Sequence, residues 1–248
     1  MITRALVLLY AAALRASLFA ALPGCSPSVN EAAAQSPASA SLAVASAPAG
    51  TGFSALDLPA PGTYVLDRIM QTPSASVLDS DGSMQPLRRF LTGKVTLFAF
   101  IYTACSDARG CPLALATMHA LKAAIAQDPR LREQVRFVSM SFDPAYDTPQ
   151  AMRSYGGIDA RPDARPRWHF LTSRSARELN PVLRGFGQDV RASDVEAASG
   201  GAMTARAPLE HLLKIYLVDQ QGTVREIYSP AFLQASAMLT DIRSLVRE

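Results

Sequence analysis

The chain has 248 residues, of which 49% are hydrophobic and 18% charged, enough for one domain with a substantial core plus accessory segments. Its formal net charge is only +3, and the basic residues are scattered rather than gathered into the stripe that nucleic-acid binding requires. These values exclude a nucleic-acid partner and leave little room for a second full domain.

Residues 1–25 have the pattern of an export signal. Two apolar runs, 5–14 and 17–22, are separated by Arg15 and lead to Cys25, as expected of a segment that enters a membrane. The motif LPGC that ends at Cys25 resembles a bacterial lipobox, whose cysteine is lipidated and becomes the mature N-terminus. The charge of Arg15 leaves an uncleaved membrane anchor as the alternative. Both alternatives predict a membrane-anchored protein on the periplasmic side of a bacterial cell envelope.

Residues 26–61 follow as a predicted disordered linker, because Ala, Ser and Pro dominate and large apolar side chains are nearly absent. We expect the folded domain to occupy residues 62–248. A hairpin is predicted within 76–94, since Asp81-Gly82 is a turn signal between two short alternating stretches.

The middle of the chain alternates strands and helices. Residues 95–101 and 135–141 are continuous apolar runs of strand length, typical of central strands covered on both faces. Pro112 begins a helix predicted to reach Gln127, because proline suits the first turn of a helix. A second helix is predicted over 149–155.

The last third predicts a short strand over 168–172, a helix after the Ser175 cap, and a long loop over 188–208. Residues 212–218 and 223–228 flank a turn and predict a hairpin, and a helix closes the chain after Pro230. This order predicts an α/β, thioredoxin-like fold, in which helices flank a central mixed sheet between an N-terminal hairpin and a C-terminal hairpin plus helix.

Cys105 and Cys111 lie between a predicted buried strand and the predicted start of a helix. Free N–H groups and the helix dipole stabilise negative charge at such a position, so we expect a favoured thiolate and a redox-active pair. If Cys25 carries lipid, these two cysteines are the remaining pair in an oxidising compartment and can form a disulfide. A purely structural disulfide is the alternative, but a loop of five residues would add little stability by chain entropy.

Three motifs in order are similar to one known family. The segments GKVTLFAFIYTACSDARGCP (93–112), VSMSFDPAYDTP (138–149) and EHLLKIYLVDQQG (210–222) together resemble the Sco/SenC family. The resemblance covers the chain from about residue 76 to its end. It implies a membrane-anchored, thioredoxin-like protein that assembles the binuclear copper site of cytochrome oxidase.

The resemblance also implies a metal site at Cys105, Cys111 and His211. Two soft thiolates and one imidazole suit copper as Cu(I) or Cu(II). The implied partner is the cytochrome oxidase copper-site subunit or another cysteine-bearing acceptor, and we expect a monomer. Asp143 and Asp147 match a loop signature of the family, and we interpret them as loop supports. Five residues separate the two cysteines here, where the family has three.

Two other functions remain open from the sequence. A thiol–disulfide oxidoreductase acting on partner cysteines would need Cys105 and Cys111 but not His211. A peroxiredoxin-like peroxidase would share the cysteine at a strand-to-helix junction. The other histidines have simpler interpretations, His119 as a half-exposed surface residue and His169 as a packing residue.

Overall fold

A computed structural model describes residues 58–105, 107–192 and 209–248. The predicted export signal, Cys25 with its lipobox and nearly all of the predicted linker lie outside these residues, as does most of the predicted loop over 188–208. Within the described ranges, no helix combines the length and the apolar character needed to cross a membrane.

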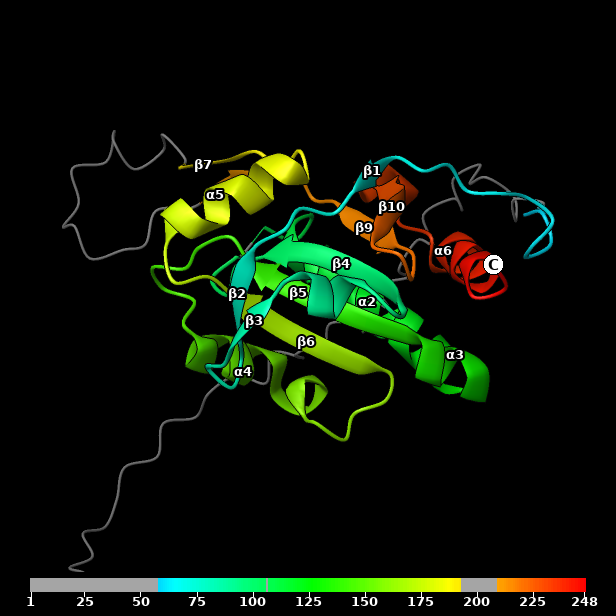
Figure 1. Ribbon diagram of the computed structural model, residues 1–248, viewed down its shortest axis with the longest axis horizontal. Coiled ribbons are helices and arrows are strands. Elements are labelled where there is room, and N and C mark those ends of the chain that lie inside the picture. Colours follow the sequence, from blue (N-terminus) through cyan, green and yellow to red (C-terminus); the bar gives the residue numbers. More distant parts are fainter. Residues whose placement is uncertain (1–57, 106, 193–208) are drawn as a thin grey trace, which may run out of the picture. The chain divides into compact units, whose positions relative to one another are not determined.

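A mixed sheet of eight strands runs through the domain (Figure 1). Its strand order is β1-β10-β9-β4-β5-β6-β2-β3, in which β5 pairs in parallel with β4 and β6 and all other neighbours are antiparallel. These strands are β1 (Met70–Gln71), β2 (Ser76–Asp79), β3 (Met84–Pro86), β4 (Val95–Ile101), β5 (Val135–Ser141), β6 (Arg167–Thr172), β9 (Ile215–Val218) and β10 (Thr223–Tyr228). A separate antiparallel ribbon contains β7 (Val190–Ala192) and β8 (Leu209–His211).

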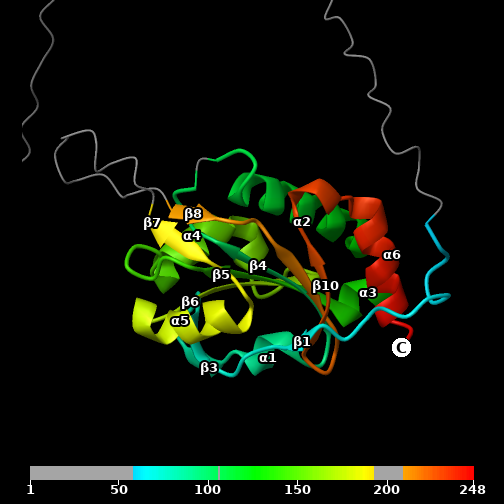
Figure 2. The same ribbon diagram turned by 90° about the horizontal axis from the view of Figure 1, so that it is seen from above.

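Helices cover both faces of the sheet, as the apolar runs of β4 and β5 require, since all residues of these two strands are buried. Figure 2 shows α2 and α6 on one side of the sheet and α1 and α5 on the other. On the second side, Phe186 after α5 stacks on Phe98 with ring centroids 4.6 Å apart. The helices are α1 (Arg88–Leu91), α2 (Cys111–Ala126), α3 (Pro129–Gln134), α4 (Pro149–Gly156), α5 (Ala176–Gly185) and α6 (Ala235–Leu245), with 3-10 turns η1 (Gly157–Ala160) and η3 (Pro230–Phe232).

The architecture confirms the predicted α/β, thioredoxin-like fold. The predicted turn at Asp81-Gly82 joins β2 to β3, and Gly82 adopts the positive φ of 87° that glycine tolerates. The predicted cap is also present, because the Ser175 side chain accepts the N–H of Glu178 at 3.3 Å.

Several short elements differ from the predictions. β1, β7, β8, α1 and α3 were not predicted, and the strand predicted to begin at Leu212 begins at Ile215. β7 lies inside the predicted loop over 188–208. Strands of two or three residues carry no readable alternation, so tertiary pairing rather than local sequence decides them. α3 had a local signal that was missed, since Asp128 caps it just before Pro129.

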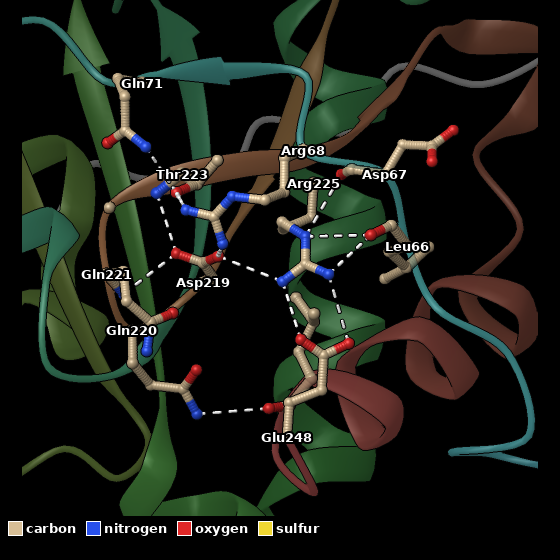
Figure 3. A network of polar contacts seen from close by, with 12 residues as sticks. Leu66, Asp67, Arg68, Gln71, Asp219, Gln220, Gln221, Thr223, Arg225 and Glu248 are labelled. Carbon is tan, nitrogen blue, oxygen red and sulfur yellow. Dashed lines mark hydrogen bonds and ion pairs between the residues drawn. The ribbon is translucent and has the colours of Figure 1, made fainter.

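A buried charge network fastens the chain before β1 to the C-terminus (Figure 3). Arg225 on β10 is 4% exposed and contacts Asp219, which is 1% exposed, at 3.2 Å. The guanidinium also contacts Glu248 at 2.8 Å and donates to the carbonyl oxygens of Leu66 and Asp67. Because each buried charge has a partner of opposite sign, removing one partner would leave an uncompensated buried charge and destabilise the fold.

Candidate metal centre

The site lies where two parallel strands end. Ile101 and Ser141 are the last residues of β4 and β5 and are register partners, so the loops that follow them begin side by side. The first loop carries Cys105, and the second carries the Asp143–Asp147 motif. The topology therefore brings two segments that are remote in sequence to one edge of the sheet.

Asp147 joins these two loops. Its fully buried carboxylate accepts the backbone N–H of Thr103 at 3.0 Å and the hydroxyl of Thr103 at 2.6 Å. A third bond comes from the hydroxyl of Ser141 at 2.6 Å. Asp143 shapes the same loop through its carbonyl oxygen, which accepts the N–H groups of Tyr146 and Asp147. Both aspartates therefore act on the loop, as the sequence interpretation expected, and Asp147 holds the start of the cysteine loop.

The two cysteines lie on either side of a glycine at the start of α2, where the chain passes close to the sulfur of Cys105. Cys111 is the first residue of α2 and is 1% exposed, whereas Cys105 is partly buried. Gly110 occupies the N-cap position between them. A Cβ at Gly110 would lie 3.3 Å from the sulfur of Cys105 and 3.3 Å from the carbonyl oxygen of Asp107, so glycine leaves the space that the sulfur fills.

His211 reaches the cysteines from the β7–β8 ribbon. It is the last residue of β8 and pairs with Val190 of β7. Its Nδ1 lies 3.3 Å from the carbonyl oxygen of Leu209, and because a carbonyl only accepts, Nδ1 carries the proton. Nε2 is then the unprotonated nitrogen, and it lies 3.7 Å from the sulfur of Cys111. Phe142 supports the imidazole, with ring centroids 4.6 Å apart.

The structure thus brings together the three residues that the sequence singled out as metal ligands. One potential ligand atom from each of Cys105, Cys111 and His211 lies within 4.8 Å of the others. Both cysteines are free thiols, so the structure describes the dithiol state and the predicted disulfide stays a prediction. His119 and His169 lie elsewhere and contact Asp159 and Asp79 respectively.

Burial dominates the protonation of Cys111 and His211. It raises the pKa of the Cys111 thiol, and the neighbouring Cys105 adds to the rise. The prediction of a favoured thiolate is therefore wrong for Cys111 in the metal-free state, because desolvation outweighs the backbone N–H groups near the sulfur. Burial also lowers the pKa of His211, which favours the neutral imidazole that metals bind.

This arrangement supports two kinds of chemistry. Two sulfurs and one imidazole nitrogen form a soft donor set, and a bound cation would displace the thiol protons. The same two sulfurs lie within 4.8 Å of each other, so disulfide formation is the second kind of chemistry that the pair could perform.

Sequence reasoning missed residues that build the site without supplying a ligand. Gly110 leaves room for the sulfur of Cys105. Phe142 packs against the imidazole of His211, and the carbonyl oxygen of Leu209 accepts a hydrogen bond from that ring. A glycine directly before a helix was the readable signal for Gly110. Leu209 had no local signal, because its role depends on the pairing of β8 with β7.

Comparison with known proteins places this geometry in a family. The SCO1/SenC family model matches residues 76–247. No curated protein matches the chain.

Solved structures resemble the fold at low sequence identity. Arabidopsis thaliana ScoI with copper bound is 21% identical, with a TM-score of 0.56 over 71% of this chain and 98% of that one. A SCO1/SenC family lipoprotein from Bacillus anthracis is 23% identical, with a TM-score of 0.55 over 76% and 98%. BsSco, described as a cytochrome c oxidase assembly protein with a disulfide switch, is 23% identical, with a TM-score of 0.55 over 74% and 98%.

The family match spans the sheet apart from β1, the cysteine loop, the Asp143–Asp147 loop and the strand that carries His211. The chain therefore belongs to the SCO1/SenC family.

Proposed function

We propose that the chain is an exported, membrane-anchored metallochaperone that binds copper and serves assembly of the cytochrome oxidase copper site. The observation that carries the proposal is the convergence of Cys105, Cys111 and His211 within 4.8 Å. Two thiolates and one neutral imidazole suit Cu(I) and Cu(II). Copper is the cargo, and this donor set would hold it until transfer.

The comparisons support the same reading. Two structures of the same fold, the ScoI proteins of Arabidopsis thaliana and Bradyrhizobium japonicum, have copper bound. BsSco is described as belonging to a family of cytochrome c oxidase assembly proteins. A cysteine-bearing copper-site subunit is therefore the acceptor that we propose.

Metal analysis of the full chain tests the copper site. The reduced protein, purified in detergent and loaded with Cu(I) or Cu(II), should keep about one copper per chain after excess metal is removed. The variants Cys105→Ser, Cys111→Ser and His211→Ala should each lose most of it. Zinc offered in competition should not displace the copper, because copper lies above zinc in the affinity order of divalent metals.

His119→Ala is the matched control, because His119 is half exposed and contacts Asp159 rather than either cysteine. It should retain as much copper as the wild type. If the three ligand variants also retain wild-type copper, the proposed site is wrong. Transfer is then tested by mixing the loaded chain with an apo oxidase copper-site domain and following the copper.

A thiol–disulfide oxidoreductase is the second candidate. It is favoured by the free thiols of Cys105 and Cys111 and by the greater exposure of Cys105, which could attack a partner. The disulfide switch described for BsSco is consistent with such chemistry.

Two variants separate the candidates. A redox enzyme should retain dithiol exchange in His211→Ala and should form a trapped mixed disulfide through Cys105 in Cys111→Ser. A metallochaperone should lose copper in His211→Ala and trap no partner. A structural disulfide would give neither result and a very low reduction potential.

The proposed location is the periplasmic side of a bacterial envelope, with Cys25 as the lipid-bearing residue. Metabolic labelling with a radioactive fatty acid should label the wild type and leave Cys25→Ala unlabelled. Labelling of neither protein, with both in the membrane fraction, would favour a helical anchor.

A further inference from the structure

Tyr102 occupies the position between β4 and the cysteine loop. It directly follows Ile101, the last residue of β4, and it is only 6% exposed. A buried tyrosine needs a partner for its hydroxyl, because an unpaired buried polar group costs free energy. The partners of Tyr102 belong to the proposed metal centre.

One hydrogen bond and two close approaches connect Tyr102 to the two cysteines. Its carbonyl oxygen accepts the N–H of Cys105 at 3.2 Å. Its backbone N–H lies near the sulfur of Cys111. Its hydroxyl lies near the sulfur of Cys105, which adds to burial in raising the pKa of the tyrosine. Tyr102 is therefore adjacent to both sulfurs at the end of the sheet.

The same hydroxyl reaches the histidine strand. The N–H of Leu209 donates to the hydroxyl oxygen of Tyr102 at 3.5 Å. The carbonyl of Leu209 accepts Nδ1–H of His211 at 3.3 Å. The rings of Tyr102 and His211 also meet edge to face, with centroids 6.0 Å apart. Hydrogen bonds thus connect His211 through Leu209 to the Tyr102 hydroxyl, and the carbonyl of the same tyrosine to Cys105.

We propose that Tyr102 is the positioning residue of this centre: its hydroxyl couples the histidine strand to the cysteine loop and, through a hydrogen bond to the Cys105 thiolate, sets the donor strength of that sulfur toward bound copper. The inference rests on the proposed copper site and adds a role for a residue that supplies no ligand. A hydrogen bond to a thiolate draws electron density away from the sulfur, so its loss makes the sulfur a stronger donor. Its loss also frees Leu209 and, through Leu209, the imidazole.

The test is Tyr102→Phe in the full chain, which keeps the ring and removes the hydroxyl. The Cu(II)-loaded variant should still hold about one copper, because all three ligands remain. Its sulfur-to-copper charge-transfer band should move to lower energy. Copper loss to a competing chelator should be roughly tenfold faster, because the freed imidazole is no longer held toward the metal and this loss outweighs the stronger sulfur donor; a factor of ten is the scale of one lost hydrogen bond.

Tyr155→Phe is the matched control. Tyr155 on α4 is half-buried, and its ring lies 6.3 Å from that of Phe170. Removing its hydroxyl tests whether loss of any phenol near the cysteines has the same effect. The control should keep the wild-type band position and the wild-type rate of copper loss.

Two outcomes overturn the inference. In the first, Tyr102→Phe matches the wild type in both band energy and rate of copper loss. In the second, Tyr155→Phe reproduces the changes, which would make them a general effect of losing a phenol. A merely structural role for Tyr102 would lower thermal stability without moving the charge-transfer band.

A measurement without copper separates this inference from the proposed function. If the wild type binds no copper, the proposed function fails, but the hydrogen-bond path still makes a prediction for the metal-free chain. Amide hydrogen exchange at Leu209 should then be roughly tenfold faster in Tyr102→Phe than in the wild type. Unchanged exchange at Leu209 would overturn the coupling itself.

Discussion

Two polar clusters lie beyond opposite ends of β4. The polar groups of one pair with each other, whereas those of the other point toward a common centre. At one end, Val218 pairs with Thr96 and leads into Asp219 of the Arg225 network. In that network, charges of opposite sign satisfy one another (Figure 3). At the other end, the cysteine loop follows Ile101, and two thiols and an imidazole nitrogen converge. The Arg225 network therefore has a structural role, whereas the cysteine–histidine cluster has the donor atoms to bind a metal cation.

The largest effect on the free energy of unfolding should come from removing Arg225 from its buried ion pairs. Arg225→Ala leaves Asp219 buried without its main cation, and we expect a loss of about 3–5 kcal/mol in the free energy of unfolding, measured by urea denaturation. Copper retention should stay at the wild-type level. Arg68→Ala is the control, because Arg68 is 59% exposed and lies 3.8 Å from the same carboxylate, so it should cost less than about 1 kcal/mol. Equal losses in both variants would contradict the distinction.

The second-largest effect should come from Asp147, whose carboxylate joins the cysteine loop to the Asp143–Asp147 loop. Asp147→Asn replaces by an NH2 donor one of the two buried carboxylate oxygens that together accept three hydrogen bonds from Thr103 and Ser141. We expect a loss of about 1–3 kcal/mol in the free energy of unfolding and reduced copper retention, measured on one preparation. Ser141→Ala removes a single bond and should give a smaller loss. Wild-type stability in Asp147→Asn would show that the carboxylate is dispensable.

A third change acts on the metal centre with little effect on the fold. Gly110→Ala places a methyl group 3.3 Å from the sulfur of Cys105, which should push that sulfur away from its partners. We expect roughly tenfold weaker copper binding, equal to about 1.4 kcal/mol, in a chelator competition. Ala108→Gly, an exposed change in the same loop, should bind copper normally.

The smallest effect should appear as a pH dependence of the metal-free fold. Burial raises the pKa of Cys111 above its ordinary value of 9.0, so above about pH 9 the unfolded chain releases a proton that the folded chain keeps. This contribution to stability is fully present below that pH and is lost as the pH rises. The wild type should lose at most about 1.4 kcal/mol per pH unit relative to Cys111→Ser. Parallel pH profiles for the two proteins would contradict the assigned pKa shift.

The sequence predicted the central strands because β4 and β5 are long apolar runs, a signal that local reading captures. It also placed both cysteines correctly, since a strand and a proline-led helix bracket them. His211 was identified only by resemblance. Its three-residue strand forms through pairing with β7, which no local pattern encodes.

The electrostatics of the centre were the least predictable part. A helix start suggested an acidified thiol, but the buried state of Cys111 depends on packing that only the folded chain defines. The role of Tyr102 was equally hidden, because its partner Leu209 is 107 residues away in sequence.

The β7–β8 ribbon gives the centre a modular construction. Cys105 lies in the loop after β4 and Cys111 at the start of α2, whereas His211 belongs to a ribbon that pairs only with itself among the described strands. For protein engineering, we therefore expect that a substitution of the third ligand leaves the register of the main sheet unchanged. Metal preference and scaffold stability can then be tuned as separate properties of one chain.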